Sequence, residues 1–322
     1  ISQIQEVNPY FNLALEEYLL KNSEAEFFLL WRCQPSVILG KHQNAYEEVR
    51  LDELAKKNLI LARRISGGGT VYHDMGNVNF TFIRYADKGN LVDFKRYTQP
   101  IIDVLQQLGL PAALEGKNDI RIHGFKVSGN AEHVYKNKVL HHGTLLYNAD
   151  LKMLKGVLTS DSGNYQSKAV KSIRSKVANI GEMLQEKYSI DDFMNILYRK
   201  IAERYHAEAF VLNDAEKNLI NKLAKEKFAT DEWIFGYSPD YVFSKSAFIE
   251  ECKIEVILKV NAGKIVYANI KLNGQHNNNL EKGFLEKPHL RRVVSEVIKN
   301  SMILGEFGLP QACFEDVCRM FY

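Results

Sequence analysis

Residues 63–77 read Arg-Arg-Ile-Ser-Gly-Gly-Gly-Thr-Val-Tyr-His-Asp-Met-Gly-Asn. Three consecutive glycines lose much conformational freedom on folding, so they are expected where the backbone approaches a ligand or adopts positive φ. Bare N–H groups in such a turn suit an anion, and the two arginines supply positive charge beside them. After the turn, Val78, Phe80 and Phe82 alternate with polar residues, as in a half-buried strand. The stretch therefore predicts an anion-binding turn that leads into a sheet.

The glycine run matches neither of the two common phosphate-binding motifs. It does not fit G-x-G-x-x-G, and no Gly-Lys pair in the chain is followed by Ser or Thr, as G-x-x-x-x-G-K-[ST] requires. A dinucleotide-binding turn and a P-loop are both excluded. On glycine content alone, an ordinary strand-to-strand turn with incidental arginines remains an alternative to phosphate binding.

Further polar clusters lie along the chain. Residues 116–120 read Gly-Lys-Asn-Asp-Ile, and Lys126 then stands between Phe125 and Val127, ahead of Ser-Gly-Asn-Ala. Without this context, a lysine flanked in this way on a strand would point to solvent. In residues 141–144, His-His-Gly-Thr, adjacent histidines fall on opposite faces of a strand, so they are not expected to bind one metal together. We expect one histidine to line the pocket and the other to be satisfied in the core.

A basic stretch follows these clusters. No acidic residue lies between Asp161 and Glu182, and the cations there are Lys168, Lys171, Arg174 and Lys176. A solvated surface loop is the simplest interpretation. Such a loop could also close over phosphates or meet an acidic protein partner.

Composition excludes several classes of protein. The chain has 322 residues and a net charge of +3, and no apolar run approaches the ~18 residues of a membrane span. We expect no signal peptide, no membrane association and no nucleic-acid partner. The cysteines show no CxxC spacing, which is typical of reduced thiols in a cytoplasmic protein and argues against structural zinc. They are Cys33, Cys252, Cys313 and Cys318.

The apolar pattern predicts an α+β protein of two domains. Asn8 and Pro9 should begin a helix, residues 27–31 and 37–39 should form buried strands, and residues 100–108 should form a helix. Strands over 120–147 and helices around 193–201 and 219–223 should complete residues 1–240. From about residue 241 the pattern changes to a hairpin with a turn at 261–263 and a helix around 290–298. Residues 241–322 therefore predict a small α+β accessory domain.

Taken together, residues 63–77, Asn118-Asp119, residues 126–129 and residues 141–144 resemble, in order and spacing, the lipoate-protein ligase A family. Residues 40–44, 173–177 and 232–236 add to the resemblance, which covers nearly the whole chain. It implies a mixed α/β catalytic domain of the biotin/lipoate ligase type and a C-terminal domain that rotates between steps. It also implies that lipoate and ATP give lipoyl-adenylate and pyrophosphate, after which a lysine amine of an acceptor lipoyl domain forms an amide.

Joining a carboxylate to a triphosphate brings like charges together, so cations and N–H donors are needed. By similarity, Lys126 is the catalytic lysine, Asp119 could bind Mg²⁺ beside the triphosphate, and Val71 and Tyr72 would wall an acyl pocket. His42 is a secondary candidate. The predicted contacts to ATP and lipoyl-AMP are Arg64, Ser66, Gly67, Gly68, Gly69, Thr70, Val71, Tyr72, His73, Asn77, Asn118, Asp119, Lys126, Ser128, Gly129, Ala131, His142 and Gly143.

The resemblance also sets the expected partners. Acceptors would be E2 subunits of 2-oxoacid dehydrogenases and the glycine cleavage H protein, the chain would act as a monomer, and no tightly bound cofactor is predicted. No cysteine lies in the polar clusters, which disfavours a thioester acyl-enzyme. The alternatives are an amidotransferase or transferase that uses another lipoylated protein or preformed lipoyl-AMP, and a non-catalytic acyl-adenylate sensor. The acyl preference, lipoate or octanoate, is left open.

Overall fold

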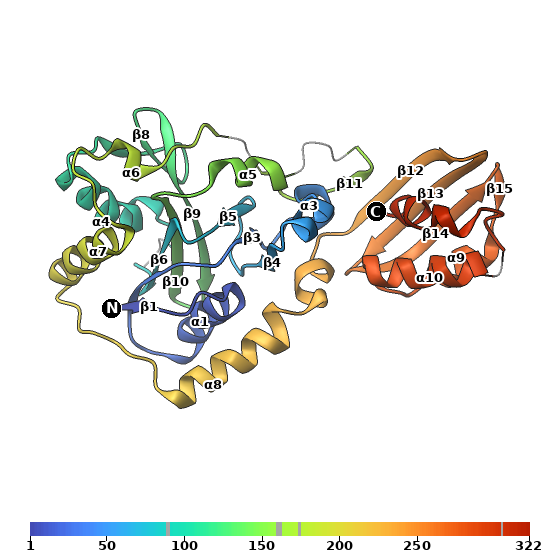
Figure 1. Cartoon of the computed structure of the whole chain (residues 1–322). Helices are drawn as coiled ribbons and strands as arrows, with labels where there is room; N and C mark the ends of the chain where they lie inside the picture. Colours follow the sequence, from blue (N-terminus) through green and yellow to red (C-terminus); the bar gives the residue numbers. More distant parts are fainter. Residues whose placement is uncertain (88–90, 159–162, 173–174, 304) are drawn as a thin grey trace. The chain divides into compact units, whose positions relative to one another are not determined.

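The computed structural model describes residues 1–87, 91–158, 163–172, 175–303 and 305–322 (Figure 1). The chain forms two compact units. The first unit contains Ile1–Lys41, Asp52–Leu158 and Ser172–Thr230, and the second contains His42–Leu51, Thr159–Lys171 and Asp231–Tyr322. The boundary near residue 240 stays a prediction. Among the described residues, no helix is both long enough and apolar enough to cross a membrane.

The first unit is built on a mixed seven-stranded sheet in the order β1-β2-β6-β10-β9-β8-β7. β1 runs parallel to β2, and every other neighbouring pair is antiparallel. The predicted half-buried strand is in fact central, and residues 77–83 are buried on both faces. The strands are β1 Ser2–Ile4, β2 Phe27–Trp31, β6 Asn77–Tyr85, β7 Ala112–Glu115, β8 Asp119–Ile122, β9 Phe125–Tyr135 and β10 Lys138–Leu146.

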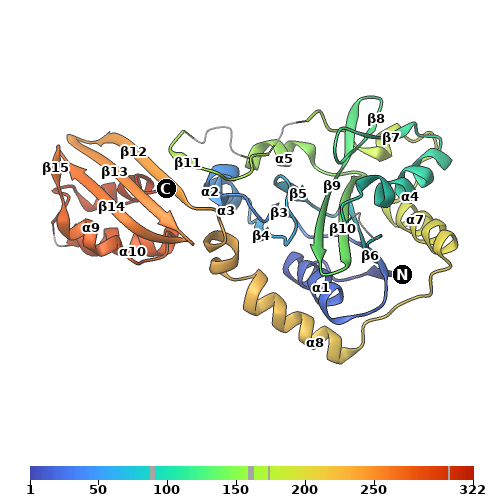
Figure 2. The same cartoon turned by 180° about the vertical axis from the view of Figure 1, so that it is seen from behind.

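Helices cover both faces of this sheet. His141 of β10 stacks on Tyr97 of α4 (Phe94–Gln107), with ring centroids 5.0 Å apart. The next residue, His142, reaches Glu16 of α1 (Pro9–Asn22). Because neighbouring residues of a strand point to opposite faces, α1 and α4 lie on opposite sides of the sheet. α7 (Ile190–Tyr205) packs beside α4, and α8 (Asp214–Leu223) lies along α1 (Figures 1 and 2).

A second, three-stranded sheet carries the glycine run. β3 (Ser36–Leu39) lies in the centre, parallel to β4 (Ile60–Arg63) and antiparallel to β5 (Val71–His73). The glycine run therefore leaves β4 and enters β5 beyond the end of β3. The first unit also contains α5 Leu151–Val157, α6 Ile180–Met183 and the π-helical turn η1 Ala224–Phe228.

The second unit has its own sheet, in the order β11-β12-β13-β14-β15, and its own core. Tyr46, far away in sequence, packs against Tyr241 and His289 in that core. The strands are β11 Tyr165–Ser167, β12 Tyr241–Ile249, β13 Cys252–Asn261, β14 Lys264–Leu272 and β15 Gln275–His276. The helices are α2 Ala45–Glu48, η2 Glu232–Gly236, α9 Asn278–Phe284, α10 Arg291–Ile303, η3 Gln311–Cys313 and α11 Phe314–Arg319. α3 (Leu51–Lys56) begins at the boundary between the units.

Most of the predicted elements are confirmed, including the Asn8 cap with Pro9 as the first helical residue. The predicted start of the helix at residue 100 is wrong. α4 begins six residues earlier, at Phe94, because the side chain of Asp93 caps its N-terminus, and Pro100 lies inside the helix. The predicted helix around 219–223 is α8, in which Ile220 is the only buried described residue and Leu219 is exposed.

Candidate functional site

Arg64 holds the glycine run from within. Its guanidinium donates to the carbonyl oxygens of Gly67, at 2.6 Å, and Gly69, at 2.7 Å, and also to Ile38 O and Ser66 Oγ, each at 3.1 Å. The side chain is buried, which lowers the pKa of Arg64 to about 10, so it stays charged at neutral pH. Arg64 therefore contacts the backbone of the loop, and its charge lies beneath the turn.

This arrangement leaves the N–H side of the turn open. In a trans peptide the N–H points away from the carbonyl oxygen, so the Gly67 carbonyl directed at Arg64 turns the N–H of Gly68 the other way. Among the described residues, the N–H groups of Gly67, Gly68 and Gly69 donate no hydrogen bond. N–H groups without a partner, next to a buried cation, suit a bound anion.

Both ends of the glycine run are anchored. Ser66 accepts the Lys41 N–H at its carbonyl oxygen, at 2.8 Å, and its Oγ lies 2.6 Å from Nε2 of His142. At the other end, the N–H of Thr70 donates to Ser172 Oγ at 2.9 Å. The loop is thus fixed where it begins and where it ends.

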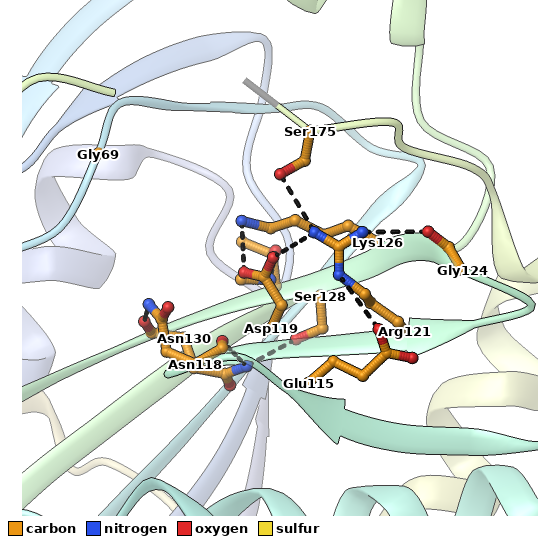
Figure 3. Close-up of polar contacts among 12 residues, drawn as sticks. Gly69, Glu115, Asn118, Asp119, Arg121, Gly124, Lys126, Ser128, Asn130 and Ser175 are labelled. Carbon is orange, nitrogen blue, oxygen red and sulfur yellow. Dashed lines mark hydrogen bonds and ion pairs between the residues drawn. The ribbon is translucent and has the colours of Figure 1, made fainter. Parts of the chain in front are cut away.

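Lys126 lies at the start of β9, beside the same turn (Figure 3). Its ammonium is 2.8 Å from Asp119 Oδ1, and the other oxygen of Asp119 is 2.9 Å from Arg121. Backbone bonds to Lys176 and Ala178 hold the strand at this residue. Asp119 therefore lies between two cations, and its negative charge holds the Lys126 side chain in the extended position that Figure 3 shows.

Strand β9 places Lys126 and the glycine run over one surface. A Cβ on Gly129 would lie 3.1 Å from the Lys126 Nζ, and a Cβ on Gly68 would lie 3.8 Å from the Cβ of Ala131. Gly129 and Ala131 are two residues apart on one face of the strand, a spacing of roughly 7 Å. The lysine ammonium and the glycine turn therefore lie over the same part of β9.

A hydrogen-bonded group of amides lies next to Lys126. Asn118 donates to the carbonyl oxygen of Asn130, and the side chain of Asn130 returns a bond to Asn118 O, at 3.0 Å (Figure 3). Asn130 also donates to Ser128 Oγ, at 3.1 Å, and lies 3.2 Å from Nε2 of His141. Asn118 and Ser128 are therefore held in place by Asn130, a residue that the sequence analysis did not select.

The remaining predicted residues follow β5 into β6. Val71 is half-buried, whereas Thr70, Tyr72, His73 and Asn77 are buried. Burial, together with Asp74, raises the pKa of Tyr72 to about 12. Burial also lowers the pKa of His73 to about 3, and neither ring nitrogen of His73 has a hydrogen-bond partner among the described residues.

The remaining candidates are Gly143, His42 and the basic stretch. Gly143 lies against Asn130 and Phe80, inside the sheet. His42 belongs to the second unit. In the basic stretch, Arg174 lies outside the described residues, and Lys171 and Lys176 are exposed.

The predicted magnesium site reduces to a single carboxylate. Mg²⁺ in nucleotide sites binds one or two carboxylates together with phosphates and water, so Asp119 fits such a role. No cluster of three or more His, Cys, Asp or Glu side chains in the described ranges could hold a metal by itself. Asp119 would therefore share the ion with phosphate oxygens.

Sequence reasoning missed two residues that fix the site, Glu16 and Ser172. Glu16 is an apparently ordinary acidic residue in a helix, but only 1% of it is exposed, and its carboxylate lies 3.0 Å from His142 Nδ1. Ser172 lies more than 100 residues from the loop that it holds. No local pattern marks the contact of Ser172. A signal for Glu16 did exist, because Glu16-Glu17 interrupts the apolar face of a helix.

Strands β2 to β10, the glycine turn and Lys126 all lie in the part of the chain that matches the catalytic domain of a class of protein ligases. The model of the lipoyl protein ligase A/B catalytic domain matches residues 8–202. Lipoate–protein ligase 1 of Staphylococcus aureus is 40% identical over 272 residues, 84% of this chain and 83% of the relative. Lipoate-protein ligase LplJ of Bacillus subtilis is 35% identical over 315 residues, 94% and 95% of the two chains.

Solved structures agree with this class. A lipoate-protein ligase A bound with ATP is 31% identical with a TM-score of 0.62, covering 71% of this chain and 95% of that one. A bi-partite lipoate protein ligase, solved in a study of the ligase and its E2 lipoyl domain from Thermoplasma acidophilum, is 29% identical with a TM-score of 0.62, over 74% and 95%. The chain belongs to the lipoate-protein ligase A family, and it is a ligase.

Proposed function

We propose that this ligase activates lipoate with ATP to lipoyl-AMP and pyrophosphate, and then transfers the lipoyl group to a lysine of an acceptor lipoyl domain. The observation that carries this proposal is that the Lys126 ammonium and the glycine turn, whose N–H groups donate no hydrogen bond among the described residues, lie over the same part of β9. The ligase A structure bound with ATP and the relative named lipoate–protein ligase 1 support the same assignment.

In the first step the lipoate carboxylate attacks the α-phosphorus of ATP, and pyrophosphate leaves. Two anions must approach each other, so the N–H groups of residues 67–69 would bind phosphate oxygens and Lys126 would neutralise the reacting oxygens. Arg64 contributes indirectly, because its buried charge orients the loop. When ATP enters, its phosphates would compete with Asp119 for the ammonium of Lys126.

In the second step the acceptor amine attacks the acyl carbon, and AMP leaves with the electron pair of the broken C–O bond. Negative charge develops first on the carbonyl oxygen and then on the phosphate. Lys126 would stabilise both. A thioester route has less support, because all four cysteines are buried and burial raises the pKa of Cys33 to about 12.

Several finer assignments belong to this proposal. Asp119 would bind Mg²⁺ with the triphosphate, which neutralises phosphate charge. Acceptors would be E2 lipoyl domains and the glycine cleavage H protein. The study of an archaeal ligase together with its E2 lipoyl domain supports the first of these. The chain would act as a cytoplasmic monomer, consistent with its buried free thiols.

The test is lipoate-dependent exchange of labelled pyrophosphate into ATP, without acceptor protein. We expect exchange by the native chain and a loss of at least about 100-fold in Lys126→Ala, since one preorganised charge contact is worth about 10²–10³ in rate. Lys117→Ala is the matched control, because this lysine lies in the same region but forms no hydrogen bond or ion pair with the described residues. Native protein that lacks exchange but lipoylates an acceptor from added lipoyl-AMP would contradict the ligase assignment and favour a transferase.

A further inference from the structure

A series of buried side-chain contacts connects the glycine run to helix α1. Ser66 Oγ lies 2.6 Å from His142 Nε2, and His142 Nδ1 lies 3.0 Å from both carboxylate oxygens of Glu16. Ser66 is fully buried, Glu16 is 1% exposed and His142 is 8% exposed. Both ring nitrogens of His142 therefore have partners within the protein, and substrate would contact other atoms of this residue.

This series of contacts continues beyond Glu16 and beyond Ser66. Thr81 donates to Glu16 Oε1 at 2.6 Å, and the indole of Trp31 donates to Thr81 at 3.0 Å. At the loop end, Arg64 Nε donates to Ser66 Oγ at 3.1 Å. Each buried polar side chain in this series of contacts has a partner, which favours a single arrangement of the side chains.

This chain of contacts crosses between the two sheets of the first unit. Ser66 and Arg64 belong to the loop of the three-stranded sheet, whereas His142 and Thr81 belong to the seven-stranded sheet that also carries Lys126. The reaction needs the loop N–H groups and the lysine ammonium at a fixed separation. The contacts through His142 fix the loop against β10, the strand that pairs with β9, which carries Lys126.

We propose that Glu16 and His142 are positioning residues, which fix the glycine run relative to Lys126 by holding the hydroxyl of Ser66. This inference rests on the function proposed above. With the proton on Nδ1, His142 donates to Glu16 and accepts from Ser66, while Ser66 accepts from Arg64. Three glycines have little rigidity of their own, so anchoring Ser66 preorganises the N–H donors for the transition state.

The test measures kcat and KM for lipoate-dependent pyrophosphate exchange in Ser66→Ala, Glu16→Ala and the double variant. Each single variant should lose about 10- to 100-fold in kcat, because misplacement of a catalytic group by about 1 Å costs this much. Since both act through His142, the double variant should lose little more than either single one. Glu16→Gln, which keeps an acceptor for Nδ1–H, should recover part of the loss.

Glu17→Gln is the matched control. Glu17 is the next residue of the same helix and is equally buried, but it pairs with Lys21 and Lys227 and has no bond to the loop. Its variant should lower the melting temperature and leave kcat unchanged. The ¹⁵N chemical shift of His142 Nε2 should change in Ser66→Ala and not in Glu17→Gln.

The outcomes separate the two proposals. Native protein without exchange contradicts the proposed ligase function itself. Native exchange combined with native kcat in Ser66→Ala overturns the positioning role, even if Glu16→Ala fails to fold. Losses that multiply in the double variant would also overturn it, because independent effects exclude a shared contact through His142.

Discussion

Individual glycines determine where Lys126 can lie. The Lys126 side chain passes over Gly129, where a Cβ would come within 3.1 Å of both its Cε and its Nζ. The end of a lysine side chain moves easily, so an added methyl group would shift the ammonium without straining the backbone. The position of the catalytic candidate thus depends on the absence of a side chain three residues away.

We therefore expect Gly129→Ala to reduce pyrophosphate exchange about 10-fold while changing the free energy of unfolding by less than about 0.5 kcal/mol. Exchange kinetics and urea denaturation would measure the two effects. Gly156→Ala is the control, because a Cβ there would have no atom of the described residues within 4 Å. Equal activity of Gly129→Ala and native protein would show that the ammonium tolerates displacement.

Helix ends in this chain follow local sequence closely. Ser189 accepts the N–H of Asp192 at 3.1 Å, and the Asp192 carboxylate accepts the N–H of Ser189 at 3.2 Å, which completes a capping box at the start of α7. Such bonds join residues three positions apart, so the local sequence alone reveals them. The start of α4 was mispredicted because Pro100 outweighed the cap at Asp93.

Replacing Ser189 with Ala should lower the free energy of unfolding by about 1 kcal/mol, the usual worth of an N-cap. Because α7 packs on α4, away from the glycine run, kcat should not change. The urea midpoint measures the first effect and pyrophosphate exchange the second. Ser189→Asn, which keeps an acceptor, should recover most of the stability, and a midpoint as low as that of the alanine variant would refute the cap.

The candidate site could be read from sequence only in its local pieces. The glycine run, Asn118-Asp119 and Lys126 stand out because their residue types are unusual for their positions. The contacts that shape them are not local, since Arg64 turns inward to carbonyls of its own loop and Glu16 reaches His142 across 126 positions. A sequence pattern identifies which residues carry chemistry, whereas side-chain direction depends on packing.

Each unit contains a buried neutral histidine, and together they couple stability to pH. Burial lowers the pKa of His73 to about 3 and that of His289 to about 4. In the unfolded chain a histidine titrates near 6.5. Below that pH the unfolded state binds more protons than the folded state, so stability falls as pH decreases. The loss is absent above about pH 6.5 and grows down to about pH 4 for His289 and about pH 3 for His73.

Each histidine should cost about 1.4 kcal/mol per pH unit within its window. Melting temperatures between pH 8 and pH 5 would show a decline that begins near pH 6.5. His289→Gln should flatten that decline in the transition of the second unit. An identical slope in native and variant protein would mean that His289 becomes protonated in the folded state.

The chain enters the second unit three times. Tyr46 and Tyr165 stack on each other, with ring centroids 6.0 Å apart, and both pack on Tyr241, although they come from three separate stretches of sequence. A fragment that ended before residue 231 would keep the first two tyrosines and lose the core that buries them. A single break in the chain therefore cannot separate the two units, because residues 42–51 and 159–171 belong to the second unit.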